Sequence, residues 1–269
     1  MHPRTAQSAF SLVELSIVLV ILGLLTGGIL AGQSLIRAAE LRAVPTEYSR
    51  WVTATRTFQD KYFALPGDMT NATAFWGTAD AANCALTMTG DARTCNGNGN
   101  GTFDRSSSGN AGNEWFRFWQ HLANAGLIEG NYAGIRFFSS GDGAESQQAD
   151  NANRGYNTPA SRMGQSTWAV ADASYVTGDA NYFAIAPGST SIVFGENLIA
   201  APPRGRALRA DEAWNIDTKK DDGIPTAGKV IGTFINSCTN AVSRTTLTNV
   251  QYNFTTTGTP CGLIFDLGS

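Results

Sequence analysis

The sequence predicts an α+β protein in which a long N-terminal helix packs on an antiparallel β-sheet domain. Three observations carry this prediction. An apolar run opens the chain, apolar residues at helical spacing continue it to about Tyr62, and short β-branched or aromatic stretches between turn residues fill the rest. The 269 residues and the 42% hydrophobic content are enough for a helix and one further domain with its own core.

The apolar run extends from Phe10 to Ala31 and contains one charged residue, Glu14. A helix of this length rises about 1.5 Å per residue and spans roughly 33 Å, which is enough to cross a bilayer. A carboxylate within hydrocarbon costs about 2.5–3.5 kcal/mol on insertion scales, so Glu14 needs a cationic partner. The run itself contains none.

The segment before this run, Met1 to Ala9, is polar, carries Arg4 and ends in a small residue. Cleavage after Ala9 would create an α-amino group at Phe10, about one helical turn from Glu14. Such an amine, from the same chain or a neighbouring subunit, can neutralise the carboxylate. Two other interpretations are open. A secretory signal peptide would be cut near residues 27–32 and rarely has an acid in its core, and an ordinary membrane anchor leaves the acid unexplained.

The sequence FSLVELSIVLVILGLL from Phe10 to Leu25, behind a short basic leader, resembles the N-terminal helix of type IV pilins and type II secretion pseudopilins. Ala9 stands where that family usually has Gly. The resemblance implies that a prepilin peptidase cuts between Ala9 and Phe10 and methylates the new amine of Phe10. It also implies that Glu14 acts in assembly.

The resemblance further implies a structural subunit of a filament. The expected partners are other pilins, in a homo- or hetero-polymer, the prepilin peptidase and an inner-membrane assembly machinery. The expected location is the bacterial inner membrane, crossed once, and after assembly an extracellular pilus or a periplasmic pseudopilus. The alternative is a membrane-tethered extracytoplasmic binding or adhesin module that does not polymerise.

Composition supports a protein that works outside the cytoplasm. Charged residues make up only 15% of the chain, which has 29 glycines. Loss of Arg4 with the leader leaves 18 Lys and Arg against 22 Asp and Glu, and no basic patch stands out, so we expect no nucleic-acid partner. The predicted divisions are a leader (1–9), a long helix (10–64, with 10–31 in the membrane or filament core) and a head domain (65–269).

Further elements follow from periodicity and turn residues. Pro45 should kink the long helix, and Pro66 and Gly67 lie beyond its end. Residues 113–127 and 207–217 predict two short helices, and His121 in the first is expected to be a half-buried polar residue. Strands are expected at residues 133–138, 166–171, 181–186, 191–194, 229–234, 250–254 and 263–267.

Two segments contain the oxygen ligands that calcium prefers. The first imitates the start of a calcium-binding loop, with the carbonyl of its seventh position and a carboxylate from the next helix as further ligands. Its residues are Asn96, Asn98, Asn100, Thr102, Asp104 and Glu114. The second consists of Asp217, Asp221 and Asp222, just before a Gly-Ile-Pro turn. A turn-rich loop explains the first segment equally well, and helix-end capping explains the second.

The cysteines predict disulfides and not catalysis. Cys84, Cys95, Cys238 and Cys261 all follow the apolar run and form no CxxC pair, so two disulfides in an oxidising compartment are expected. Of the three connectivities we favour Cys84–Cys95 and Cys238–Cys261, because neighbouring cysteines close short loops. With one histidine outside the leader and no P-loop or dinucleotide motif, we expect no enzymatic activity.

Overall fold

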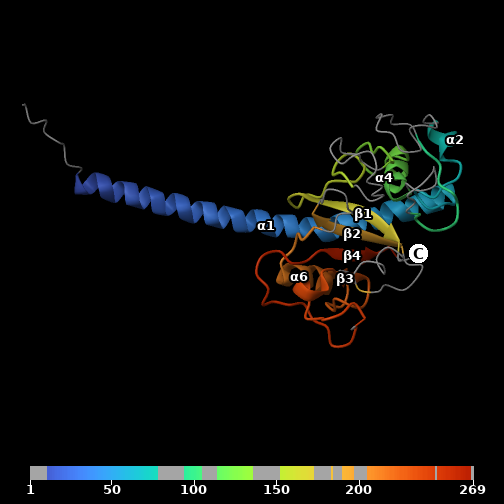
Figure 1. Cartoon of the computed structure of the whole chain (residues 1–269). Coiled ribbons are helices and arrows are strands. Elements are labelled where there is room, and N and C mark those ends of the chain that lie inside the picture. The colour runs from blue at the N-terminus through green and yellow to red at the C-terminus, as the bar shows by residue number, and fades with distance from the viewer. Residues whose placement is uncertain are drawn as a thin grey trace, which may run out of the picture. The chain divides into compact units, whose positions relative to one another are not determined.

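A computed structural model describes residues 11–77, 94–104, 114–135, 152–172, 183, 190–196, 205–245 and 247–267. The chain divides into two compact units, Met1–Arg42 and Ala43–Ser269. One continuous helix, α1 (Leu12–Tyr62), contributes residues to both units. All other described helices and strands belong to the second unit (Figure 1).

The second unit is built on a four-stranded antiparallel sheet with the order β1-β2-β4-β3. Its strands are β1 (Ser166–Asp172), β2 (Thr190–Glu196), β3 (Val230–Gly232) and β4 (Leu263–Asp266). Trp168 lies opposite Phe194 in the register, and the two rings are 4.8 Å apart. Trp168 also lies 5.5 Å from the ring of Phe265 on β4. These buried aromatic pairs stabilise the sheet from one face, and the predicted α+β class is confirmed.

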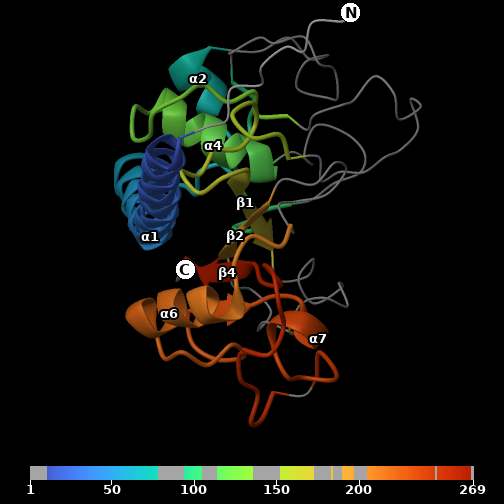
Figure 2. The same cartoon turned by 90° about the vertical axis from the view of Figure 1, so that its left-hand side faces the viewer.

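Short helices lie at both edges of this sheet. They are α2 (Ala72–Trp76), α4 (Glu114–Asn124), α6 (Ala210–Lys220) and α7 (Ile235–Cys238). Helix α4 contacts β1 and α6 contacts β3, which are the two edge strands. Figures 1 and 2 show α4 and α6 on opposite sides of the sheet. The two segments considered for calcium are therefore separate.

The part of α1 after Ala43 packs on the second unit through one face. Its buried residues are Val44, Trp51, Ala54, Thr55 and Phe58, at the spacing of one helical face. The rings of Trp51 and Trp119 meet edge-on at 5.3 Å, and Tyr48 stacks on Phe265 at 4.7 Å. Helix α1 ends at Tyr62, as expected from the helical spacing. Pro45 lies inside it, and the helix is continuous through this residue.

A carboxylate on α1 adds a polar attachment to the sheet. Glu47 Oε2 accepts hydrogen bonds from Ser161 Oγ at 2.7 Å and Trp168 Nε1 at 2.8 Å, and Oε1 accepts one from Arg162 N at 2.9 Å. The next residue, Tyr48, donates its hydroxyl to the carbonyl of Asp266 at 2.6 Å. One turn of α1 is therefore fixed to both β1 and β4. We refer to this group of contacts as the Glu47 clasp.

Several element predictions were wrong or fall outside the described residues. Residues 250–254 contain only an isolated bridge between Tyr252 and Thr239, and residues 133–135 form no strand. Helix α6 begins three residues later than predicted, because Ala207 and Leu208 donate their N–H groups to the carbonyl of Cys261. Residues 136–138 lie outside the described part, and so do residues 181–186 except Phe183.

Candidate functional site

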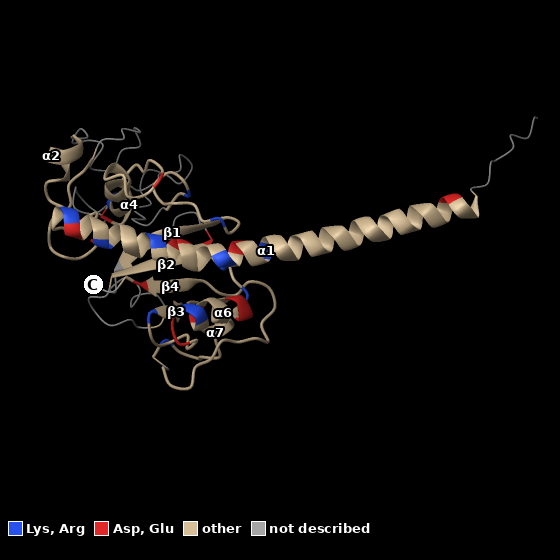
Figure 3. Cartoon of the chain, turned by 180° about the vertical axis from the view of Figure 1, so that it is seen from behind, with Lys and Arg blue, Asp and Glu red and all other residues tan. Residues whose placement is uncertain are grey.

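The N-terminal half of α1 presents an apolar surface. Its large side chains between Leu12 and Ile36 are all exposed, from 50% at Ile21 to 83% at Leu12. The most apolar window has a mean hydropathy of 2.4 and contains no buried residue. Among the described residues, α1 is the one helix long and apolar enough to cross a membrane. The sequence between Leu12 and Ile36 contains one charged residue, an acid, and Figure 3 shows acidic colour at the start of this half of the helix.

That acidic residue, Glu14, belongs to the N-terminal cap of α1. Its Oε2 atom accepts a hydrogen bond from Ser11 N at 2.8 Å, and Ser11 Oγ accepts one from Val13 N at 3.3 Å. These two bonds cap the helix, with the Ser11 hydroxyl on the N–H of the second helical residue, and they satisfy backbone N–H groups that have no partner within the helix.

A polar cap at the start of an exposed apolar helix matches a known processing signal. Residues 4–30 carry the prokaryotic N-terminal methylation motif. The methylation motif is the signature of type IV pilins and pseudopilins, and in this respect the N-terminal part of the chain is similar to theirs. With α1, it fits a single-pass membrane anchor. No curated protein and no solved structure matches the chain.

The methylation motif includes the expected cleavage position. Ala9 and Phe10 both lie outside the described residues, so cleavage between them and methylation of Phe10 stay predictions. Glu14 is described, and the structure adds the hydrogen bond to Ser11 that the sequence analysis missed. The signal for it was present, because Ser followed three residues later by Glu is the pattern of a capping box.

The first segment considered for calcium forms a loop held by its own side chains. The side-chain amide groups of Asn98 and Asn100 both donate hydrogen bonds to Asp104 Oδ2, at 2.5 and 2.8 Å. The side-chain oxygen Oδ1 of Asn100 accepts a hydrogen bond from Thr102 N at 2.9 Å. These four residues are therefore brought together. Asn96 is turned elsewhere, because its Oδ1 accepts a hydrogen bond from the N–H of Thr73 on α2 at 2.9 Å.

Two buried carboxylates, those of Asp68 and Glu114, bind the backbone of this loop. Asp68 accepts hydrogen bonds from the backbone N–H groups of residues 99–101, at 2.6, 3.1 and 2.8 Å. Glu114 uses both oxygens to accept from Asn98 N and Asp104 N, at 2.9 and 2.8 Å. Burial raises the pKa of Glu114 to about 7, although these two donors oppose the shift. Asp68 was absent from the predicted set, since its partners lie more than 30 residues away.

The second segment gathers its three carboxylates at one point. Asp217, Asp221 and Asp222 each offer an oxygen, and these oxygens lie within 4.8 Å of one another. Hard oxygen ligands at this separation suit a calcium ion. It is the one such group of acidic, histidine or cysteine residues in the described part of the chain. Calcium binding at either segment stays a prediction.

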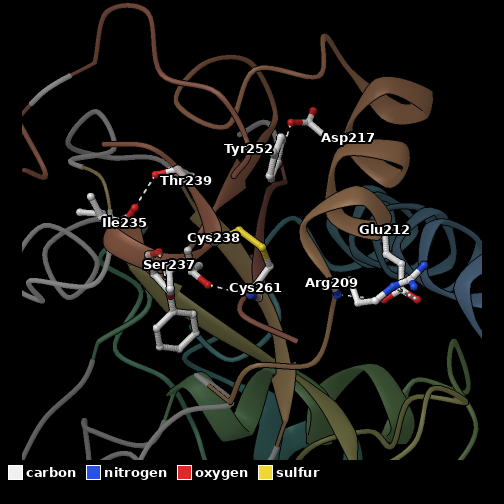
Figure 4. The surroundings of a disulfide bond; sticks show 12 residues. Arg209, Glu212, Asp217, Ile235, Ser237, Cys238, Thr239, Tyr252 and Cys261 are labelled. Atoms are coloured by element: carbon white, nitrogen blue, oxygen red, sulfur yellow. Dashed lines mark hydrogen bonds and ion pairs between the residues drawn. A yellow bond between two sulfur atoms is a disulfide. The ribbon is translucent and has the colours of Figure 1, made fainter. Parts of the chain in front are cut away.

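These carboxylates also have the capping contacts that were the alternative explanation. Asp217 is buried, and it accepts hydrogen bonds from the hydroxyl of Tyr252 at 2.8 Å (Figure 4) and from Gly223 N at 3.2 Å. Burial raises the pKa of Asp217 to about 7, and the charges of Asp222 and Asp221 add to the rise, whereas the two hydrogen bonds oppose it. A proton or a cation would therefore relieve the same electrostatic cost.

His121 is a buried structural residue. Its Nδ1 atom accepts a hydrogen bond from Gly67 N at 2.9 Å, and its Nε2 atom lies 2.9 Å from the carbonyl oxygen of Cys95. Nε2 must therefore carry the proton. Burial lowers the pKa of His121 to about 4, so the ring stays neutral. The expected half-buried position was wrong, because both ring nitrogens bind backbone atoms and the side chain has no exposed surface.

A disulfide closes the C-terminal region. Cys238 at the end of α7 is bonded to Cys261 before β4, with Cα atoms 4.8 Å apart (Figure 4), as the sequence predicted. Cys95 is also disulfide-bonded. Its expected partner, Cys84, lies outside the described residues, so that pairing stays a prediction. The bond between Cys238 and Cys261 closes the loop formed by residues 239–260.

Proposed function

We propose that this chain is a structural subunit of a type IV pilus or of a type II secretion pseudopilus. The observation that carries the proposal is the methylation motif on a helix whose apolar half is exposed and begins with a single acid. In this proposal a prepilin peptidase removes residues 1–9 and methylates Phe10. The helix of residues 10–64 is then drawn from the inner membrane into a filament, and the head of residues 65–269 faces outward.

The energetics of the exposed half favour a filament core over a single soluble molecule. Apolar surface in water costs about 25 cal/mol per Å², so the side chains between Leu12 and Ile36 need lipid or other helices around them. The second carboxylate oxygen of Glu14, Oε1, has no hydrogen-bond partner among the described residues. We assign this oxygen to the methylated amine of a neighbouring subunit, where low dielectric strengthens the pair.

Mass spectrometry of the mature N-terminus tests the proposal. The expected result is a chain that begins with methylated Phe10 in material sheared from cells or extracted from their membranes. A chain that keeps Met1, or begins beyond Gly27, contradicts it and supports a tethered binding module or a cleaved signal peptide. Sheared filaments with this chain as the main band identify a pilus. Filaments confined to the periplasm, together with a secretion defect on deletion, identify a pseudopilus.

A further inference from the structure

Among the described residues of the second unit, large apolar side chains are exposed at Phe63 and Phe75 and, in the C-terminal part, at Trp214, Ile224, Val242, Leu247 and Phe254. Trp214 on α6 is 43% exposed and Ile224 in the following turn 45%, whereas Leu247 and Phe254 in the disulfide-closed loop are 44% and 60% exposed. The rings of Trp214 and Phe254 meet edge-on at 6.0 Å, and Thr226 Oγ1 donates to the carbonyl of Leu247 at 3.2 Å. We call these four residues the C-terminal patch. The first contact joins two exposed rings, and the second joins the two segments that carry Ile224 and Leu247; exposed apolar side chains grouped in this way are typical of an interaction site.

The C-terminal patch is held by fixed contacts and needs little ordering on binding. The disulfide closes the loop that carries Leu247 and Phe254. Asp217 binds the hydroxyl of Tyr252 in the same loop, and Asp222 accepts a hydrogen bond from Ile224 N at 2.8 Å. A surface that is ordered before binding loses less conformational entropy in the complex. The acids Asp221 and Asp222 lie at its rim, directly after the basic residues Lys219 and Lys220, and Asp222 is exposed.

A second surface, on α1, has the complementary properties. A shallow groove of about 390 Å³ is lined by Ser49, Arg50, Thr53, Ala54, Thr57 and Leu127, and we call it the α1 groove. Its hydroxyl groups donate back to the helix carbonyls of Pro45, Ser49 and Thr53, at 2.9, 2.9 and 2.8 Å. Another molecule can therefore cover these side chains without leaving their hydroxyl donors unpaired.

The rim of the α1 groove carries the basic side chain of Arg50. Arg50 lies over the ring of Trp51 at 5.3 Å, and Arg56 and Lys61 are exposed further along the same helix. Basic residues along α1 are visible in Figure 3. The ion pair of Arg50 with Glu129 is long, at 3.8 Å, and the Glu129 side chain is 93% exposed, so it contributes little. Arg50 therefore remains accessible to an acidic partner.

We propose that the C-terminal patch of one subunit packs into the α1 groove of the next subunit along the filament. The inference rests on the proposed function and identifies the contact between heads. The apolar side chains supply the buried area, and Asp222 of one copy faces Arg50 of the other, which sets the register. Because the two surfaces differ and each chain carries both, the contact can repeat from copy to copy, as a filament requires, and it is not the self-complementary contact of a twofold dimer.

Charge reversal tests this contact in the full chain expressed with its assembly machinery. Asp222→Arg and Arg50→Glu should each lower the yield of sheared filaments at least fivefold, and the double variant should recover it to within twofold of the wild type. Arg206→Glu, a reversal at an exposed residue that belongs to neither surface, is the matched control and should leave the yield unchanged. The melting temperature of each purified variant shows that the head is folded.

A cysteine pair gives a second measurement. Ile224→Cys combined with Thr53→Cys should produce a ladder of covalent oligomers when wild-type-like filaments are oxidised, and either substitution alone should not. Filaments that form normally but give no ladder, or single reversals that behave like the control Arg206→Glu, overturn the contact and leave the proposed function intact. A wild-type chain that forms no filament under any condition overturns the proposed function, and the contact with it.

Discussion

At the scale of single residues, Glu14 combines a structural and an electrostatic role. Its carboxylate caps the first turn of α1 through Ser11 N, and in the proposed filament it also binds a neighbour's amine. An amide retains an acceptor oxygen for the cap but lacks the charge. The substitution Glu14→Gln therefore separates the two roles.

We expect Glu14→Gln to lower the filament yield at least tenfold and to leave membrane insertion unchanged, because a charge pair at low dielectric is lost while the cap remains. The measurement is the amount of chain in sheared filaments against the amount in membranes. Ser16→Ala removes a polar group from the same segment and serves as the control, since the Ser16 hydroxyl binds only a carbonyl of its own helix. A Glu14→Gln chain that assembles like the wild type shows that the charge is not needed.

Asp217 predicts a pH dependence of stability. Its pKa of about 7 in the folded chain lies above the unfolded value of about 4, so the folded state keeps a proton that the unfolded state has released. The protonated Asp217 side chain therefore stabilises the folded state fully below about pH 4, and this contribution to the free energy of unfolding is lost as the pH rises through about 7. His121 contributes in the opposite direction, because its folded pKa of about 4 makes stability fall as the pH decreases from about 6.5.

The variant Asp217→Asn isolates the first contribution. We expect the wild type's advantage in unfolding free energy over this variant to shrink by about 2 kcal/mol between pH 5 and pH 8. Urea unfolding of the full chain in detergent, followed by tryptophan fluorescence, measures it. Asp60→Asn, at an exposed position on α1, is the control. An advantage that stays constant across this range contradicts the raised pKa.

At the scale of elements, the Glu47 clasp attaches α1 to the sheet. Each hydrogen bond to a charged group contributes about 1.5–3 kcal/mol, and removing the carboxylate leaves buried donors without an acceptor. We expect Glu47→Ala to lower the unfolding free energy of the head by about 3 kcal/mol. Glu40→Ala on the same helix should cost less than about 1 kcal/mol, because Glu40 pairs only with Arg37 at 3.6 Å near the surface. Equal costs for the two variants would show that the clasp contributes nothing specific.

At the scale of the whole molecule, calcium is tested by the stability of the head. Extracellular calcium sites bind at about 10⁻⁴–10⁻³ M, so about 5 mM calcium should stabilise the folded state by about 1 kcal/mol and raise the melting temperature by about 2–4 °C over chelator. Asp222→Asn should abolish the rise if the ion binds at α6, and Asp104→Asn should abolish it if the ion binds in the asparagine loop. An unchanged melting temperature in the wild type removes both sites.

The features that could be predicted from the sequence are those that depend on residues close together in the chain. The apolar run with Glu14, the helical spacing as far as Tyr62 and the β-branched stretches that form β1 and β2 all depend on neighbours a few residues apart. Contacts between distant segments were missed. The partners of Glu47 are Ser161, Arg162 and Trp168, which follow it in the chain by 114, 115 and 121 positions. The spacing of residues within α1 does not reveal these contacts.

The same limit explains the errors around the candidate calcium segments. The spacing of Asn98, Asn100 and Asp104 predicted side chains that converge, and they do. The spacing did not show that both carboxylate oxygens of Glu114 accept hydrogen bonds from the loop backbone. The position of Glu114 depends on how α4 packs. In the C-terminal region, the β-like composition of residues 250–254 was outweighed by the bridge from Tyr252 to Thr239 inside the disulfide-closed loop.

The Glu47 clasp also has a mechanical consequence. Helix α1 is continuous from Leu12 to Tyr62, so a pull on its N-terminal end travels along the helix axis to its attachment within the head. The bonds of Glu47 and Tyr48 lie on consecutive residues and are loaded together, so they must break at once rather than one after another. In the proposed filament, tension along α1 would therefore load this turn together with the buried face of the helix that follows it.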